Sequence, residues 1–275
     1  MDARDREGGA ARPFAGDTAN FYAHYRRSYP AEFVAHLQGF DLGCGGRLLD
    51  LGCGTGTLLF QLAPSFEQAV GIDPEPDMLR EAKRAAREQG IRNVEWIRAS
   101  SAELRELEPL LGRFDLVTIG TAFHFMEPRA TLSELQRIAG GGVVAVAYNG
   151  TPMWLHRDPW ATALRAVLES RLGRPLRDTD FTAEALRAAE EAMRDLGYTQ
   201  VERWEQTSTE TIDLEFVVGH ILSATSTDQI PPADRQDFAQ EVSSAITAVA
   251  PSGRVTETVQ VRAVIGHTSH GHLPR

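Results

Sequence analysis

Three glycines at alternate positions follow an apolar run and an acid in LLDLGCGTG, residues 48–56. Glycine adopts backbone angles and permits close approaches that other residues do not, so the spacing predicts a turn whose main chain contacts a ligand. A second acid, Asp73, ends the run VGID twenty-one residues after Gly52. At the edge of a sheet such an acid can accept hydrogen bonds from both hydroxyls of a ribose.

The neighbouring residues narrow the chemistry of the ligand. Thr57 stands where a dinucleotide-binding fingerprint has its last glycine. Asp50 would lie awkwardly beside a pyrophosphate, but it suits a ligand that carries an ammonium group. The predicted ligand therefore has a ribose and a positive group and lacks a pyrophosphate, as S-adenosylmethionine does. The alternative is that the glycines only form a tight strand-to-helix turn in another α/β protein.

The elements that must position this turn follow from the periodicity of the chain. Apolar runs alternate with helical spacing through the first half, which predicts right-handed βαβ units and a parallel sheet. Strands are predicted at 47–51, 69–72, 94–97, 114–120, 141–148, 201–212 and 254–266, the last of them antiparallel. Helices are predicted at 21–29, 57–62, 77–89, 151–172, 183–196 and over most of 213–249.

Three stretches resemble motifs of the class I S-adenosylmethionine-dependent methyltransferases: LLDLGCGTG (48–56), GIDPEPDML (71–79) and FDLVTIGTAFHFM (114–126). The likeness covers residues 45–150. It implies methyl transfer from S-adenosylmethionine, with S-adenosylhomocysteine as the product. The expected fold is α/β and Rossmann-like: a mostly parallel seven-stranded sheet with an antiparallel final strand, an N-terminal helical lid and a helical cap.

The expected organisation has four parts. A flexible leader covers residues 1–16, and a Rossmann-like core with its lid covers residues 17–150. A helical substrate cap, together with the final strands that complete the sheet, covers residues 151–266. A flexible tail covers residues 267–275.

The resemblance implies cofactor contacts in several segments. The glycine loop packs on the methionine part, the acid after the second strand holds the ribose, and the loop after the third strand flanks the adenine. The aromatic, basic helix before Pro30 folds over the cofactor as a lid, or else packs as an ordinary surface helix. The expected contacts are Tyr25, Arg26, Asp50, Gly52, Cys53, Gly54, Gly56, Asp73, Pro74, Met78, Ser101, Ala102, Glu103 and Gly120.

Three of these positions have a second interpretation. Many relatives carry an acid where Ser101 stands, and that acid contacts the adenine amine. Met78 lies over the adenine face or packs in the core. Cys53 is interpreted as a small residue that fills the turn, because nothing nearby supplies a base for a reactive thiol.

The expected chemistry is alignment of the acceptor with the methyl group and exclusion of water, with removal of a proton where the acceptor needs it. The resemblance places His124 at the edge that faces the methyl, so it is a candidate base or a structural residue in a pocket wall. Glu127 is a second candidate proton acceptor. The residues expected to contact the acceptor are Tyr22, Phe123, Trp154, His156, Asp158 and Trp160.

Composition bears on partners and location. The formal net charge of −10 works against nucleic-acid binding, and no window is apolar for long enough to span a membrane. The chain has two cysteines, and the histidines of its tail are interpreted as solvated, so we expect no metal site and a reducing cytoplasm. Whether the protein is a monomer or a homodimer stays open.

The acceptor is expected to be a small molecule. The acidic surface, with Glu127 and Asp158 near the mouth, and a likeness to natural-product tailoring enzymes favour an amine of an amino sugar or aminoglycoside-like metabolite, and hence a role in antibiotic biosynthesis. A phenol or sugar hydroxyl is the close alternative, and a carbon nucleophile is the third. A protein that binds S-adenosylmethionine without methyl transfer is the competing function.

Overall fold

The computed structural model describes residues 14–40, 46–225 and 229–268. Most of the expected leader and tail therefore lies outside the described residues, as do Cys44, His270 and His272. Within these ranges, no helix combines the length and the apolar character that crossing a bilayer requires.

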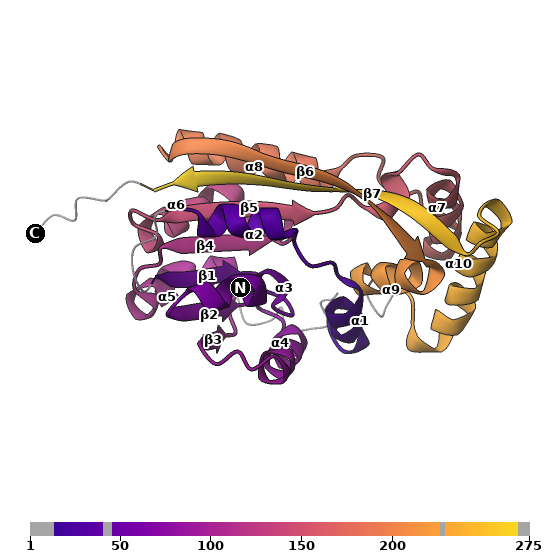
Figure 1. The fold of residues 1–275 in the computed structure, drawn as a ribbon, viewed down its shortest axis with the longest axis horizontal. Coiled ribbons are helices and arrows are strands. Elements are labelled where there is room, and N and C mark those ends of the chain that lie inside the picture. Colours follow the sequence, from indigo (N-terminus) through magenta and orange to yellow (C-terminus); the bar gives the residue numbers. More distant parts are fainter. Residues whose placement is uncertain (1–13, 41–45, 226–228, 269–275) are drawn as a thin grey trace, which may run out of the picture.

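One mixed sheet organises the chain (Figure 1). Its strand order is β3-β2-β1-β4-β5-β7-β6, in which β7 is antiparallel to both neighbours and the other neighbouring strands are parallel. The strands are β1 (Arg47–Leu51), β2 (Gln68–Ile72), β3 (Val94–Ile97), β4 (Leu116–Gly120), β5 (Val143–Asn149), β6 (Thr199–Asp213) and β7 (Arg254–His267). This arrangement confirms the predicted fold class.

Burial along the strands follows their sequences. β1, β2, β4 and β5 are apolar runs buried on both faces, as expected where helices cover both sides of parallel strands. β7 instead alternates between exposed and buried residues from Arg254 to Val259, and it is continuously buried from Ala263 to Gly266. The change marks the point where β7 enters the middle of the sheet beside β5.

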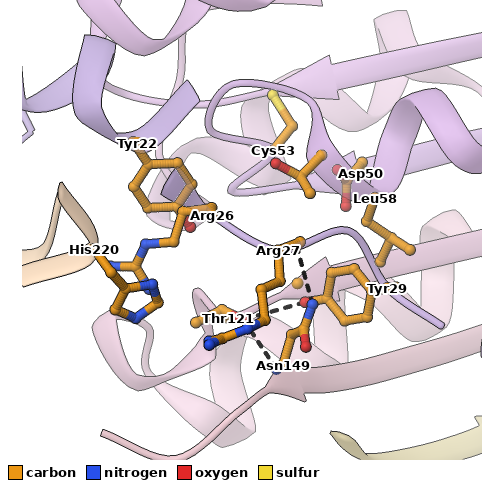
Figure 2. Close-up of a pocket in the computed structure, with 12 residues that line it drawn as sticks. Tyr22, Arg26, Arg27, Tyr29, Asp50, Cys53, Leu58, Thr121, Asn149 and His220 are labelled. Atoms are coloured by element: carbon orange, nitrogen blue, oxygen red, sulfur yellow. Dashed lines mark hydrogen bonds between the residues drawn. The ribbon is translucent and has the colours of Figure 1, made fainter. Parts of the chain in front are cut away.

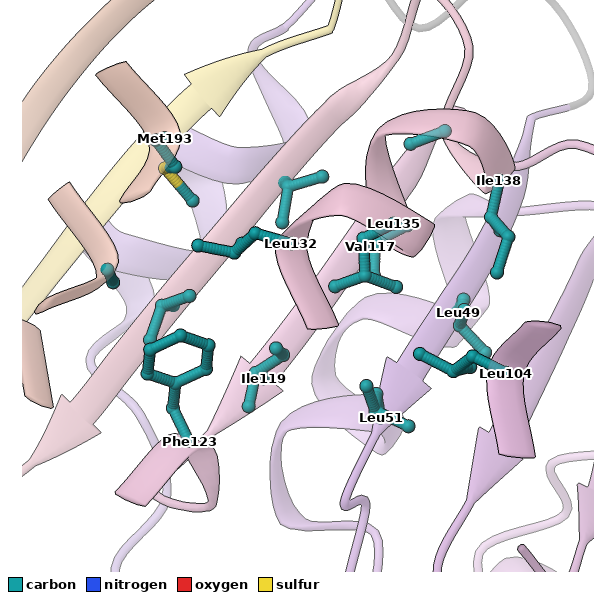
Figure 3. Packing of buried hydrophobic residues seen from close by; sticks show 14 of the residues in the cluster. Leu49, Leu51, Leu104, Val117, Ile119, Phe123, Leu132, Leu135, Ile138 and Met193 are labelled. Carbon is teal, nitrogen blue, oxygen red and sulfur yellow. The ribbon is translucent and has the colours of Figure 1, made fainter. Parts of the chain in front are cut away.

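Helices cover both faces of the sheet. Those on one face are α2 (Ala31–Gln38) and α3 (Thr57–Leu62), and those on the other are α5 (Leu104–Leu111), α6 (Pro128–Ile138) and α8 (Phe181–Asp195). α4 (Pro76–Glu88) follows β2. Figure 3 shows how the second face packs, with Leu132 and Leu135 of α6 lying against the sheet that carries Val117 and Ile119 of β4. The two apolar clusters fix the strands that carry the site.

A further group of helices forms a cap beyond the carboxyl ends of the parallel strands. β6 and β7 extend past β5 and carry this cap (Figure 1). Its helices are α7 (Pro159–Leu172), α9 (Leu214–Ala224) and α10 (Arg235–Val249). The cap has its own apolar cluster, which includes Trp160, Val217 and Phe238. The N-terminal helix α1 (Asp17–Tyr25) packs on α9.

Two helices are shorter than the sequence predicts. α1 ends at Tyr25, and the backbone is extended at Arg26 and again at Pro30, where α2 follows. The residue before a proline is pushed out of the helical region, which limits how far α1 can run. The helix predicted from residue 151 begins at Pro159, after a 3-10 turn at Met153–Leu155.

The strand order places a crevice at one edge of the sheet. β1 lies between β2 and β4. The strands that follow it in sequence are added first on one side, as β2 and β3, and then on the other, as β4 and β5, so the strand order reverses beside β1. Ligands of open α/β sheets bind at such a reversal, outside the carboxyl ends of the strands. The glycine loop, the 3-10 turn Phe123–Phe125 after β4 and the loop after β5 all meet at this edge.

The cap core supplies a test of the packing. We expect Phe238→Ala to lower the free energy of unfolding by about 3–5 kcal/mol, because the ring is fully buried and its removal leaves a cavity. Val249→Ala on the same helix is the control, because that side chain is 49% exposed and its change should stay within about 0.5 kcal/mol. Urea unfolding measures both; equal effects would contradict the packing of α10.

Candidate active site

The turn after β1 depends on its glycines. Gly52, Gly54 and Gly56 have φ angles of 71°, 54° and 89°, in the left-handed region that favours glycine. A Cβ on Gly52 would lie 2.6 Å from the Cβ of Ala122. The turn therefore needs glycine both for its backbone angles and for its close approach to the segment after β4.

Asp73, at the end of β2, is tied to this turn. Its side chain is buried; Oδ2 accepts the Gly54 N–H at 2.9 Å and Oδ1 accepts the Glu75 N–H at 2.9 Å. Burial raises the pKa of this carboxyl, and the two backbone hydrogen bonds act against that shift. Since a carboxylate oxygen has more than one acceptor site, both oxygens can still accept hydrogen bonds from a ligand.

Asp50 lies under the same turn and is 2% exposed. Thr118 of β4 donates a hydrogen bond to its Oδ1 at 2.7 Å. Burial raises the pKa of Asp50 from 3.8 to about 7, the Thr118 hydrogen bond opposes this rise, and the nearby Asp73 adds to it. A positive ligand group in the crevice would favour the ionised form.

The segments expected to flank an adenine are also at this edge. Ser101, Ala102 and Glu103 form a 3-10 turn, and the Glu103 carboxylate accepts hydrogen bonds from the backbone and hydroxyl of Ser100. Met78 is buried on α4, and Pro74 is exposed. Cys53 is buried, and burial raises the pKa of its thiol, which disfavours the reactive thiolate.

Arg26 points from the end of α1 into the site (Figure 2). Its Nε donates to Ser223 Oγ at 2.8 Å, and its guanidinium lies 4.6 Å from the centre of the Tyr22 ring. Burial lowers the pKa of Arg26. In the described part of the chain, no Asp or Glu forms an ion pair with it, so its positive charge has no carboxylate partner there.

The two lid tyrosines have different surroundings. Tyr22 lies over the glycine loop and lines the site, whereas Tyr25 packs against α9. The Tyr25 hydroxyl donates to Glu215 at 2.9 Å, and a Cβ on Gly219 would lie 2.3 Å from its ring. The prediction of Tyr25 as a cofactor contact stays a prediction, and the geometry favours Tyr22 in that place.

Two cavities meet beneath the lid. The smaller one, of about 30 Å³, lies between the glycine loop and Arg26, and the larger one, of about 210 Å³, lies between α1, the loops after β4 and β5, and α9. Five residues line both: Tyr22, Arg26, Thr121, Asn149 and His220. The cavities are therefore neighbouring parts of one site.

Thr121 forms part of the shared wall in an unusual conformation. Its φ is 54°, which a β-branched residue rarely adopts, and its N–H donates to the Ala147 carbonyl at 2.7 Å. The hydroxyls of Thr121 and Tyr29 lie 3.1 Å apart. Gly120 precedes it, and a Cβ there would lie 2.9 Å from the Tyr29 hydroxyl. Strain of this kind is concentrated at functional sites.

Aromatic side chains form part of the wall of the larger cavity. Phe14, Tyr22, Phe125, Trp154 and Phe181 line it together with two histidines and Arg26. Among the described residues that line it, none is an Asp or a Glu. A planar, apolar molecule can stack on such rings, and no carboxylate of the described lining would pair with a cation.

The other residues predicted to contact an acceptor lie elsewhere. Phe123 is buried in the core of the sheet, and Trp160 is buried in the cap, where its indole N–H donates to the Thr256 carbonyl at 3.1 Å. His156 has its Nε2 3.5 Å from the buried Glu257. Asp158 and Glu127 are exposed at the starts of α7 and α6. These assignments stay predictions.

His124 lies against the larger cavity and is bound to Tyr148. The Tyr148 hydroxyl accepts the His124 backbone N–H at 2.9 Å, and it lies 3.1 Å from Nδ1 of the ring. Burial, and to a lesser extent the charge of Arg26, lowers the pKa of His124 to about 4. The ring is therefore neutral near pH 7.

Sequence reasoning missed His220 and Asn149. His220 lies on α9, about a hundred residues after the last motif, in the helix LEFVVGHILSA, which carries no sequence signature. Asn149 fixes the chain after the lid, because its side-chain amide donates to the carbonyls of Arg27 and Ser28 at 3.0 Å each. Within the ranges the structure covers, no cluster of three or more His, Cys, Asp or Glu could hold a metal ion.

Comparison with known proteins agrees with this geometry. Residues 48–142 match a family described as a methyltransferase domain. The chain is 34% identical over 107 residues to the "Probable S-adenosylmethionine-dependent methyltransferase CRG1" of Saccharomyces cerevisiae, which covers 38% of this chain and 36% of that protein. It is 30% identical over 164 residues to the "Uncharacterized methyltransferase Rv3342" of Mycobacterium tuberculosis, with 59% of this chain and 61% of that protein covered.

The fold is similar to that of a solved structure titled "Conversion of a Disulfide Bond into a Thioacetal Group during Echinomycin Biosynthesis". The TM-score is 0.53 and the sequence identity is 19%. The superposition covers 96% of this chain and 88% of that one. Residues 48–142 thus match a methyltransferase domain. The resemblance to the S-adenosylmethionine-dependent family is confirmed; the chain spans 36% and 61% of the lengths of the two curated relatives above.

Asp50 gives the protein a pH-dependent stability. Its folded-state pKa of about 7 lies above the unfolded value of 3.8, so the unfolded chain loses this proton first as the pH rises. Relative to Asp50→Asn, the wild-type free energy of unfolding should fall by roughly 3 kcal/mol between pH 4 and pH 7. Denaturant titrations at several pH values measure this, with Asp158→Asn as the control at an exposed acid. Parallel profiles for wild type and Asp50→Asn would refute the shift.

Proposed function

We propose that this protein is an S-adenosylmethionine-dependent methyltransferase that methylates a small acceptor held in the larger cavity. The observation that carries the proposal is the guanidinium of Arg26, which is desolvated beside the glycine loop and has no carboxylate partner among the described residues. A buried charge is unfavourable until it is paired. The carboxylate of the methionine part would supply that partner, and the planar fork of arginine can bind both of its oxygens.

The residues around Arg26 fit the rest of the molecule. Gly52 and Gly54 leave the floor of the crevice without side chains, and a Cβ on Gly52 would clash with Ala122. Asp73 has acceptor positions left for the ribose hydroxyls. Asp50 can respond to the positive ammonium and sulfonium groups by ionising.

The lid must move for this binding to occur. The smaller cavity of about 30 Å³ is large enough for one or two water molecules, and Tyr22 occupies the space above Gly54. α1 and the following Arg26 are held to the cap by the Tyr25–Glu215 and Arg26–Ser223 hydrogen bonds and by the Asp17–Arg235 ion pair. We propose that α1 swings away to admit the methyl donor and then closes over it.

The protein's own contribution to the reaction is mainly positional. The bound donor supplies a methyl group on a sulfonium that is already a good leaving group. Thr121 and Asn149 define the wall where the two cavities meet, and the closed lid excludes water. Alignment and desolvation of this kind account for much of the rate in group transfer.

The walls of the larger cavity favour a hydroxyl acceptor on a flat, apolar molecule. Its lining includes five Phe, Tyr and Trp rings and no described carboxylate that would pair with a cationic amine. The predicted amine of an amino sugar therefore finds no support in the cavity, and a phenol fits its walls better. A role in antibiotic biosynthesis and a cytoplasmic location stay predictions.

Binding of the donor can be tested without knowing the acceptor. We expect Asp73→Ala to weaken S-adenosylmethionine binding by about 100-fold or more, because two hydrogen bonds to a charged group are lost. Titration calorimetry measures the affinity, and unfolding curves check that the variant folds. Glu95→Gln, at an exposed acid on β3, is the control and should bind as wild type does. Equal affinities for Asp73→Ala and wild type would contradict the assigned site.

The acceptor class requires a direct assay. We incubate the protein with methyl-labelled S-adenosylmethionine and matched panels of phenols and aromatic amines, and detect products by mass spectrometry. We expect methylated phenols, since the cavity offers aromatic contacts and its described lining holds no counter-ion for an ammonium. Turnover of amines alone would overturn the acceptor class. Tight donor binding with no product from either panel would favour a binding protein without transfer.

A further inference from the structure

We propose that His220 of the cap, rather than His124, takes the proton from the acceptor hydroxyl. The inference rests on the proposed function and adds a catalytic residue to it. It starts from position: under that function the methyl group crosses from donor to acceptor where the two cavities meet. His220 lies at that junction, whereas His124 lines the larger cavity alone.

The junction offers few groups that could accept a proton. Of the five residues that line both cavities, Arg26 is a cation, and Thr121 and Asn149 carry neutral side chains. Tyr22 is a phenol, and burial raises its pKa, which leaves it protonated. The imidazole of His220 is the remaining side chain there with a basic lone pair.

The hydrogen bonds of His220 determine which ring nitrogen is basic. Nδ1 lies 3.1 Å from the carbonyl oxygen of Tyr25, the last residue of α1. A carbonyl can only accept, so the neutral ring carries its hydrogen on Nδ1 and its lone pair on Nε2. Among the described residues, no hydrogen bond to Nε2 is present. The closed lid thus orients the base through the Tyr25 carbonyl.

His124 has the opposite arrangement. The Tyr148 hydroxyl oxygen already accepts the His124 backbone N–H. Among the described residues, the acceptor within reach of the Tyr148 hydroxyl hydrogen is Nδ1 of His124. That hydrogen bond places the ring hydrogen of His124 on Nε2. His124 therefore presents a donor to the larger cavity, which suits it to orient an acceptor oxygen rather than to deprotonate it.

Burial and two nearby arginines favour the neutral form of His220. Arg26 and Arg27, from the segment after α1, face it, and the polar contact from α1 is the Tyr25 carbonyl. Burial first, and then these two cations, lowers the pKa of His220. A donor carboxylate on Arg26 would cancel part of that charge, so the pKa of His220 should rise when the donor is bound.

The proposed reaction transfers one methyl group and releases one proton. The acceptor oxygen forms a bond to the methyl carbon while the methyl–sulfur bond breaks and its electron pair stays on sulfur. The hydroxyl proton passes to Nε2 of His220 and is released to water after the lid opens. The products are the methylated acceptor, S-adenosylhomocysteine and one proton.

Matched substitutions separate the base from a structural role. His220→Asn keeps a donor near Nδ1 for the Tyr25 carbonyl but removes Nε2, and His124→Gln is the companion variant. With a phenol that the wild type methylates, we expect His220→Asn to lower kcat by about 10²–10⁴-fold while S-adenosylmethionine affinity holds. The kcat of His124→Gln should fall less.

Chemical rescue provides a further test. Added imidazole should restore part of the activity of His220→Ala, and the rate with more acidic phenols should fall less. A larger loss in His124→Gln, or no rescue and no dependence on phenol pKa, would overturn the role.

A second measurement needs no turnover, so it stands even if the acceptor panel yields no product. Nitrogen-15 spectra of the histidine rings, assigned with His220→Asn and His124→Gln, report the tautomers. We expect the hydrogen of His220 on Nδ1 and that of His124 on Nε2. Adding S-adenosylhomocysteine, which carries the same carboxylate, should raise the pKa of His220. The hydrogen of His220 on Nε2, or an unchanged pKa with the ligand bound, would refute the proposal.

Discussion

The contact between Asp73 and the glycine loop fixes the geometry on which the proposed donor site depends. One carboxylate oxygen accepts the Gly54 N–H and the other accepts the Glu75 N–H, so the end of β2 and the turn after β1 are held to each other. The side chain has one orientation before any ligand arrives. A preorganised acceptor of this kind loses little freedom on binding, which leaves more of the interaction energy for affinity.

The cap supplies the second wall of the site. The end of the lid helix and the residues that follow it are attached to this cap. β6 and β7 carry α9 out over the crevice (Figure 1). Arg27, the second residue after α1, pairs with Glu210 of β6 and with the buried Glu257 of β7. Removing one partner of a buried pair leaves the other charge uncompensated. The Arg27 ion pairs therefore hold the segment after α1 to β6 and β7, and under the proposed function this segment would be the pivot of the lid.

The fold could largely be predicted because its signals are local. Runs such as LVTIG in β4 are apolar on both faces, and the spacing of Gly52 and Asp73 identifies the crevice. The surroundings of single side chains depend on distant packing instead. Trp160 follows β5 closely in sequence, yet α7 buries it in the cap. His220 is part of an apolar helix, and only the course of β6 brings it back to Arg26.

The wall shared by the two cavities has a consequence for how the site fills. Under the proposed function, Tyr22 and Arg26 contact the donor on one side and shape the pocket of the acceptor on the other. The acceptor pocket is complete only when the helix that bears them has closed, and closure over an empty crevice leaves Arg26 unneutralised. Occupancy of the two halves is thus thermodynamically linked, and linkage of this kind is reciprocal. The enzyme would recognise its second substrate only in the company of the first.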